Sequence, residues 1–256
     1  MRLCMCLKAF ELAFLAAATL AYPIQQRDAI GNGNIVGLPE SVPSNAAGEL
    51  YLKYKPYLLR DSGCVPYPAV DSQGNTKFPA IHMFAECKTV RASSPRGGPS
   101  ADCLSSTGQI YARAATVNGN HGIMYAWYWP KDEPSEWESW LGIGHRHDWE
   151  SVVVWLSSNA PDATVLGVAA SGHGKYTSTK SPPFHNSSVL IKYYSIAGLL
   201  DHSLGFTASI GQQQPLIAWE SMSSVVQDAL STTDFGAATV PFIDSEFRKH
   251  LDNAAL

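Results

Sequence analysis

Gly144-His145-Arg146-His147-Asp148-Trp149-Glu150 leads directly into Ser151-Val152-Val153-Val154-Trp155-Leu156. The first stretch sets two imidazoles, two carboxylates and one guanidinium close together, and the second is almost wholly apolar. Charged groups packed this densely against an apolar strand carry a large desolvation cost unless they are paired or bind a cation. The two stretches together predict a polar rim at the start of a buried β-strand, and a metal-binding rim is the simplest interpretation.

The spacing of the acidic residues indicates how such a rim is built. Asp148 and Glu150 are two positions apart, so a strand projects both to one face. His145 follows Gly144, in a loop that can fold back, and Asp132 ends the preceding apolar stretch. If the two strands pair as a hairpin, Asp132 reaches the same rim. The predicted ligand set is Asp132, His145, Asp148 and Glu150, whose three oxygen donors favour Mg²⁺ or Ca²⁺, or Mn²⁺, over zinc.

A structural alternative stands beside this metal site. Arg146 and Lys131 are suitable partners for the carboxylates, which would make the segment a salt-bridged turn. His147 fits three roles: support for a metal ligand, a base, or a hydrogen-bonded structural histidine. The pair Asp201-His202 is either a surface loop or a second loop on the same rim.

The rest of the chain predicts a mostly β fold. Segments rich in Val, Ile, Tyr and Trp suit a pleated, packed surface. Gly122–Trp129 is apolar on both faces and is predicted to be a central strand. The number of strands and the few helices favour a β-sandwich flanked by short helices. The predicted strands are 109–117, 122–129, 149–156, 164–170, 188–194, 205–210 and 216–219, and the predicted helices are 48–58, 221–230 and 242–251.

The chain begins with features of a secretory signal. Arg2 and Lys8 precede an apolar run, and small residues near Ala21 offer a cleavage site, so residues 1–21 are predicted to be removed. Residues 22–47 are polar and rich in Gly, Pro, Asn and Ser and are interpreted as a flexible leader, with one folded domain over 48–250. The net charge of −4 argues against a nucleic-acid partner.

Cysteines and a sequon are consistent with secretion. Cleavage leaves Cys64, Cys87 and Cys103, which allow at most one disulfide among them. Asn186-Ser187-Ser188 is an N-glycosylation sequon.

At the heptapeptide the chain resembles the necrosis- and ethylene-inducing peptide 1-like proteins, a family of secreted microbial cytolysins. Gly144–Glu150 matches the signature of that family in full, and Gly122–Asp132 resembles the segment that precedes it. Gly63–Asp71 and Gln214–Glu220 also resemble family blocks, and the similarity runs from about Gly48 to Phe247.

The resemblance implies a structure and a site. It implies a β-sandwich like those of sea-anemone actinoporins and fungal fruit-body lectins, with a divalent cation at one end. It implies that Asp132, His145, Asp148 and Glu150 hold the cation, and that Asp201 and His202 lie near a sugar pocket. It also implies a disulfide between Cys64 and Cys103. Arg146 and His147 belong to the expected ligand-binding set.

The resemblance also implies a function. Family members bind the terminal hexose of glycosyl inositol phosphoryl ceramide sphingolipids at the plant plasma membrane and permeabilise it, and peptides from their central segment trigger plant immune recognition. The leading hypothesis is therefore a secreted, metal-dependent cytolysin and virulence factor that causes necrosis and is not an enzyme. Two rivals are a metal-dependent hydrolase, with His147 as base, and a non-toxic lectin-like or immune-eliciting homologue.

Overall fold

The computed structural model describes residues 29–30, 34–77, 104–132, 145–195 and 202–256. The predicted signal segment lies outside these ranges, as do Cys103 and Asp201. Two short strands, β1 (Ala29–Ile30) and β3 (Thr76–Lys77), pair in parallel as a separate small sheet.

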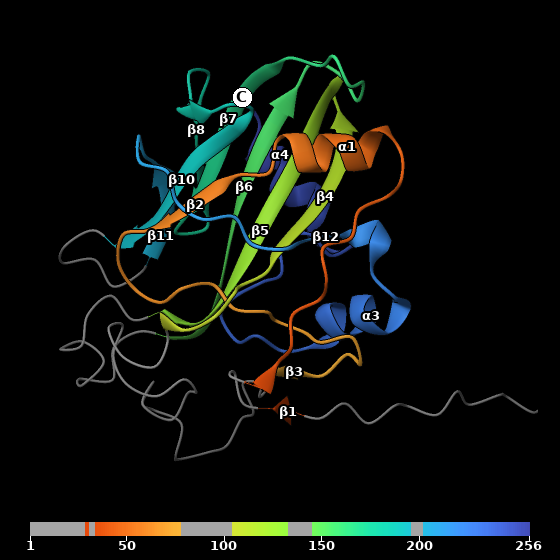
Figure 1. Ribbon diagram of the computed structural model, residues 1–256, viewed down its shortest axis with the longest axis vertical. Coiled ribbons are helices and arrows are strands. Elements are labelled where there is room, and N and C mark those ends of the chain that lie inside the picture. Colours follow the sequence, from red (N-terminus) through yellow and green to blue (C-terminus); the bar gives the residue numbers. More distant parts are fainter. Residues whose placement is uncertain (1–28, 31–33, 78–103, 133–144, 196–201) are drawn as a thin grey trace, which may run out of the picture.

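The main body is one ten-stranded sheet, in which β8 pairs with β7 and β9 pairs with β10 outside the main path (Figure 1). The strands of that path, in order of pairing, are β12 (Leu216–Ala218), β4 (Ile110–Val117), β5 (Asn120–Asp132), β6 (His145–Leu156), β7 (Val165–Gly172), β11 (His202–Phe206), β10 (Ser188–Ser195) and β2 (Tyr57–Arg60). The two side strands are β8 (Lys175–Thr179) and β9 (Phe184–His185).

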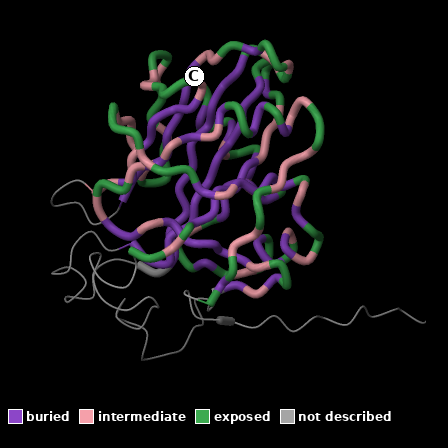
Figure 2. The backbone as a smooth tube through the Cα atoms, viewed as in Figure 1, coloured by how far each residue is buried: buried purple, intermediate pink, exposed green. Residues whose placement is uncertain are grey.

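The long strands β5 and β6 form the centre of the sheet. Every residue of β5 after Asn120 is buried, which confirms the predicted central strand. A two-residue turn, Asn118-Gly119, joins β4 to β5, and both residues have positive φ (51° and 85°). Such turns match the twist of paired strands, and asparagine and glycine tolerate the left-handed conformation that they require. Figure 2 shows buried backbone running through these central strands and exposed backbone at many loops and turns.

Helices cover parts of the sheet. They are α1 (Ala46–Lys53), α3 (Ser224–Thr232), α4 (Phe247–Asn253) and the 3-10 turn η4 (Trp219–Ser221). The Asn45 side chain accepts hydrogen bonds from the first turn of α1, as an N-cap residue should. The hydroxyl of Tyr125 on β5 donates to the Tyr51 carbonyl at 2.9 Å, which fixes α1 against the centre of the sheet. None of the described helices is long and apolar enough to cross a membrane.

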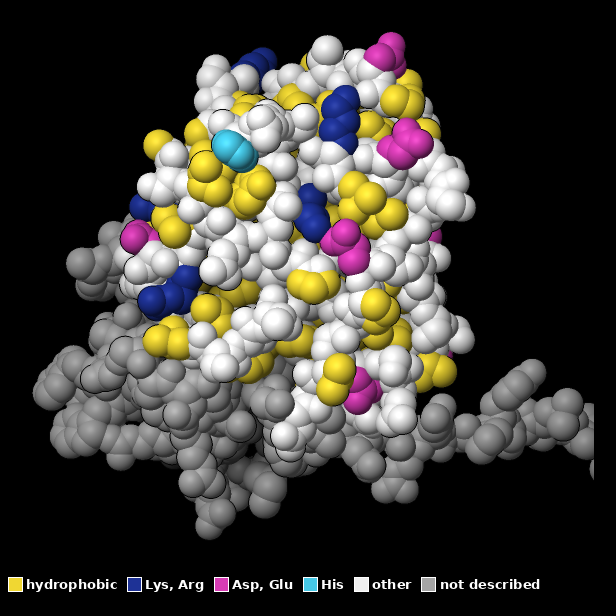
Figure 3. Space-filling model, viewed as in Figure 1, with side chains coloured by type: hydrophobic (Ala, Val, Ile, Leu, Met, Phe, Trp, Pro, Cys, Tyr) yellow, Lys and Arg dark blue, Asp and Glu magenta, His cyan; other side chains and the backbone are white. Residues whose placement is uncertain are grey.

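The mostly β fold with a few short helices is confirmed, and its described strands form one curled sheet with the small β1–β3 pair beside it. The likeness to actinoporin and lectin sandwiches stays a prediction. On the face seen in Figure 3, the basic side chains lie apart from one another, and one near the centre touches an acidic side chain. That face therefore offers no extended basic patch of the kind that binds phosphate backbones.

Several predicted boundaries were wrong. The first helix ends at Lys53, and Tyr57–Arg60 pairs with β10 instead. Later helices begin at Ser224 and Phe247, a few residues after the predicted starts. Residues 34–47 of the predicted flexible leader pack on the domain, because Ile35 is buried and Ser41 bridges to Ile217.

Candidate functional site

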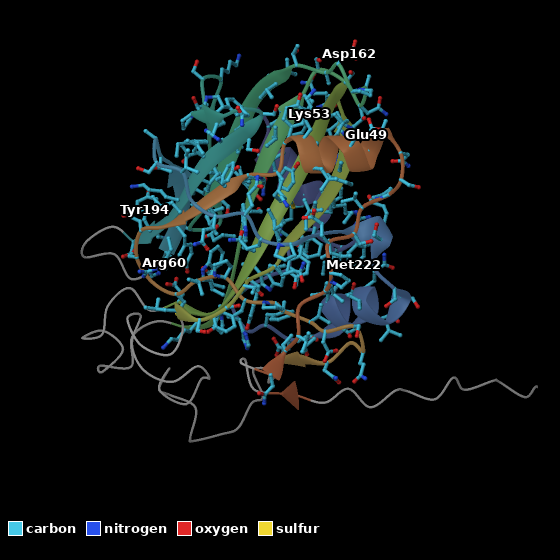
Figure 4. All side chains as sticks on the ribbon, viewed as in Figure 1. Glu49, Lys53, Arg60, Asp162, Tyr194 and Met222 are labelled. Atoms are coloured by element: carbon cyan, nitrogen blue, oxygen red, sulfur yellow. The ribbon has the colours of Figure 1, made fainter. Side chains whose placement is uncertain are left out.

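Two strand pairs bring the candidate residues to one end of the sheet. In the first pair, Asp132 at the end of β5 lies opposite His145 at the start of β6. The predicted hairpin is therefore confirmed. In the second pair, Ser195 at the end of β10 lies opposite His202 at the start of β11. Tyr194, labelled in Figure 4 with Arg60 of β2, marks this end of the sheet.

Asp132 and His202 join the two pairs directly. Both are almost fully buried, with exposed fractions of 1% and 2%. One carboxylate oxygen of Asp132 contacts His202 Nδ1, and the other accepts the His202 backbone N–H at 3.0 Å. His202 is thus the first residue of a strand, whereas the sequence placed it in a loop before a strand starting at Gly205. The interpretation of Asp201-His202 as a surface pair is wrong for His202.

Asp148 accepts a hydrogen bond from β10, which is not an immediate neighbour of β6 in the sheet. Its Oδ2 accepts a hydrogen bond of 2.9 Å from the hydroxyl of Tyr193 on β10. The Tyr193 ring stacks on Trp129 at 3.9 Å between centroids and on His202 at 4.5 Å. Burial, followed by the negative charge of Asp148, raises the pKa of Tyr193 well above its usual value. The phenol therefore stays protonated and donates.

Glu150 is held by the strand on its other side. Its Oε2 accepts a hydrogen bond from the hydroxyl of Ser171 on β7. That hydroxyl also accepts the backbone N–H of Ser151 at 2.8 Å. The Ser151 side chain continues to Tyr176 at 2.6 Å, and Tyr176 continues to His250 of α4 at 3.2 Å. A chain of hydrogen bonds therefore links the rim to the C-terminal helix.

A pocket of about 370 Å³ opens beside these groups. The three candidate carboxylates and two of their partners line one part of it: Asp132, Asp148, Glu150, Ser171 and His202. Lys175, Glu246 and Lys249 also belong to the lining. Each of the three candidate carboxylate residues is at most 8% exposed. Buried carboxylates set close together repel one another and lose solvation, so the part of the pocket beside Asp132, Asp148 and Glu150 is suited to a cation.

Two other predicted residues, His147 and Lys131, lie outside the pocket lining. His147 has a positive φ of 59°, is buried, and its Nδ1 lies 2.6 Å from the Tyr128 hydroxyl. Its ring meets Phe235 edge-on, and it is not among the described residues that line the pocket. These are the contacts of a structural histidine. Lys131 is also buried and absent from that lining. The side chains of His145 and Arg146 lie outside the described residues, as does Asp201.

The donor chemistry suits a hard cation. Within the described part of the chain, no three His, Cys, Asp or Glu groups converge closely enough to hold one ion together. Mg²⁺ does not require such convergence, because it binds through one or two carboxylates and keeps several waters. The three described carboxylates therefore have the chemistry of a hydrated cation site rather than of a closed cage.

Two secretion-related positions are also described. Cys64 is disulfide-bonded and 2% exposed. Its predicted partner, Cys103, lies outside the described residues. Asn186 is exposed, with φ 54°, in the turn between β9 and β10. An acceptor asparagine in such a turn is open to modification.

Sequence reasoning missed Tyr193 and Ser171. Val189, Ile191 and Tyr193 alternate on one face of a predicted strand, and a buried tyrosine hydroxyl needs a hydrogen-bond partner. That pattern predicts that the Tyr193 hydroxyl has a hydrogen-bond partner, but not which residue provides it. Ser171 lies within β7, one residue beyond the end of the predicted strand 164–170.

Comparison with known proteins shows the family to which the chain belongs. The family described as "Necrosis inducing protein (NPP1)" matches residues 48–254. NLP effector protein 10 of Phytophthora capsici is 39% identical over 254 residues, covering 96% of this chain and 98% of the relative.

Solved structures of similar proteins share the fold. One, of NLPPya in complex with mannosamine, has a TM-score of 0.76 at 40% identity and covers 90% of this chain and all of that one. Another, of the non-toxic HaNLP3 protein, has a TM-score of 0.74 at 36% identity and covers 87% and 97%. The chain belongs to the necrosis-inducing protein family, whose solved members include toxins and a sugar-bound form.

Proposed function

We propose that this chain is a secreted cytolysin that grips the glycan headgroup of a plant plasma-membrane sphingolipid through a divalent cation, and then permeabilises the membrane. The chemical class of the lipid is glycosyl inositol phosphoryl ceramide. The observation that carries this proposal is the pocket lined by Asp132, Asp148 and Glu150, all buried at one end of the sheet. Sugar hydroxyls are suitable oxygen ligands for a hard cation that holds exchangeable waters.

The cation would be Mg²⁺ or Ca²⁺, held by Asp132, Asp148 and Glu150 together with His145. Its role would be to orient glycan hydroxyls at the rim. His202 supports this arrangement by holding Asp132 through two contacts. A solved relative in complex with mannosamine supports a sugar as the ligand class. Many weak single contacts on one membrane add up to firm attachment, so no covalent chemistry is required.

Dye release from vesicles tests the proposal. Vesicles containing glycosyl inositol phosphoryl ceramide should leak in the presence of Mg²⁺ or Ca²⁺, and should stop leaking when EDTA is added. Vesicles without that lipid should stay intact. Leakage that persists unchanged in EDTA would contradict a role for the cation, and consumption of the lipid would favour a metal-dependent hydrolase.

Asp148→Asn is the matching variant. The amide oxygen still accepts the Tyr193 hydroxyl, so the fold should persist while one negative charge is lost. Asp162→Asn is its control, because Asp162 is exposed and labelled at the opposite end of the molecule in Figure 4. Loss of leakage in the first variant alone supports the site, and equal activity in both variants would refute it.

A second candidate function is a non-lytic homologue that binds the lipid or elicits immunity without leakage. The structural similarity to the non-toxic HaNLP3 protein supports this second candidate. Vesicle flotation separates the two: binding without dye release identifies the non-lytic form. Leaf infiltration of the purified protein beside Asp148→Asn then shows whether necrosis depends on the rim.

A further inference from the structure

The rim carboxylates are each held by another described residue. Asp132 is held by His202, Asp148 by Tyr193, and Glu150 by Ser171. These partners come from β11, β10 and β7, none of which belongs to the β5–β6 hairpin that carries the carboxylates. The hairpin therefore supplies the acidic groups, while other strands set how those groups point.

Tyr193 is itself rigidly placed. Its ring lies between Trp129 and His202, nearly parallel to both at interplanar angles of 9° and 8°. It is 1% exposed, so no water competes for its hydroxyl from bulk solvent. A hydrogen bond from a fixed phenol to one oxygen of Asp148 fixes the plane of that carboxylate and the direction of its other oxygen.

Ser171 acts on Glu150 in the same way. Its hydroxyl accepts the backbone N–H of Ser151, the residue next to Glu150, and donates to the Glu150 carboxylate. The Ser151 N–H orients the hydroxyl oxygen, so the hydroxyl hydrogen is directed at the carboxylate. A glutamate side chain has three rotatable bonds, and this contact restricts the freedom that cation binding would otherwise have to remove.

We propose that Tyr193 and Ser171 are positioning residues of the rim, which hold Asp148 and Glu150 in the orientation that binds a divalent cation. This inference rests on the proposed function, because it assumes that the rim binds a cation. Residues that orient metal ligands through hydrogen bonds contribute strongly to affinity, and their loss costs about 10- to 100-fold in metal binding.

The test measures Mg²⁺ and Ca²⁺ affinity by isothermal titration calorimetry, together with Tm without added metal. Tyr193→Phe keeps the stacked ring and removes only the hydroxyl. Its control is Tyr54→Phe, since Tyr54 is buried and its hydroxyl donates to the Ala163 carbonyl at 2.7 Å, away from the rim. Both variants should lower Tm by similar amounts, and only Tyr193→Phe should weaken cation binding by about 10- to 100-fold.

Ser171 allows a matched pair. Ser171→Val and Ser171→Thr add the same bulk, but only threonine retains the hydroxyl. The valine variant should bind the cation about 10- to 100-fold more weakly, and the threonine variant should retain most of the affinity. Equal, wild-type-like affinity in Tyr193→Phe and Ser171→Val would overturn the inference and leave the proposed function standing. A wild-type protein that binds neither cation would overturn both.

Discussion

Replacing Gly63 with alanine should disturb the rim through His202. Gly63 has φ +70°, and a Cβ built there would lie 2.5 Å from His202 Nε2 and 3.1 Å from Tyr193 Cε1. The His202 ring has little room to move, because it is 2% exposed, contacts Asp132 and stacks on Tyr193. The added methyl group must therefore displace either the backbone or the ring that holds Asp132.

The expected loss of stability in Gly63→Ala follows from a comparison with Gly119. That glycine has φ +85° and nothing within 4 Å of a built Cβ, so alanine there costs only the left-handed conformation, about 1–2 kcal/mol. Gly63→Ala carries the same conformational cost plus overpacking, which adds about 1–3 kcal/mol. Subtracting the Gly119→Ala effect isolates the collision with His202.

Urea denaturation followed by tryptophan fluorescence measures both free energies of unfolding. We expect Gly63→Ala to lose about 1–3 kcal/mol more than Gly119→Ala, and to bind divalent cations more weakly as well. Equal losses in the two variants would refute the close packing of His202 against residue 63. A larger loss in Gly63→Ala with unchanged cation affinity would separate His202 packing from the site.

Three further predictions follow from other contacts. Burial lowers the pKa of His121, so protonation favours the unfolded chain as the pH falls below the unfolded pKa of about 6.5. The Tm of the protein should therefore fall between pH 7.5 and 5.5, and it should fall less steeply in His121→Gln. Parallel slopes in the two proteins would exclude His121 as a cause. Arg113 donates to the Phe242 carbonyl at 2.8 Å and lies over the Trp219 and Phe247 rings. In urea denaturation, Arg113→Lys should therefore lower the free energy of unfolding by about 1–2 kcal/mol, and Arg248→Lys, at an exposed position, by less than about 0.5 kcal/mol. Similar losses in the two variants would contradict this prediction. Expression in a eukaryotic secretory host should yield protein heavier by one glycan, and Asn186→Gln should remove that mass; identical masses would show that the sequon is not used.

The β5–β6 hairpin was predictable because both strands carry strong local signals. The apolar run through Trp129 and the spacing of Asp148 and Glu150 predict three acidic residues at one rim. The turn at Asn118-Gly119 carries an equally local signal.

The remaining contacts depend on partners that are distant in sequence. His202 reaches Asp132, seventy positions away, and no local pattern of the sequence predicts that contact. His147 has a left-handed backbone conformation and contacts the Tyr128 hydroxyl, and no sequence pattern predicts either feature. Tyr57 and Leu58 continued a helical pattern, but pairing with β10 outweighed that local preference.

A crystal structure of the protein grown with Mg²⁺ or Ca²⁺ tests the central claim most directly. The account predicts density for one ion at the pocket, approached by Asp132, His145, Asp148 and Glu150 directly or through ordered waters, with Tyr193 and Ser171 still hydrogen-bonded to their carboxylates. A well-ordered rim in which those four side chains point away from one another, with no ion at millimolar cation concentrations, would contradict it.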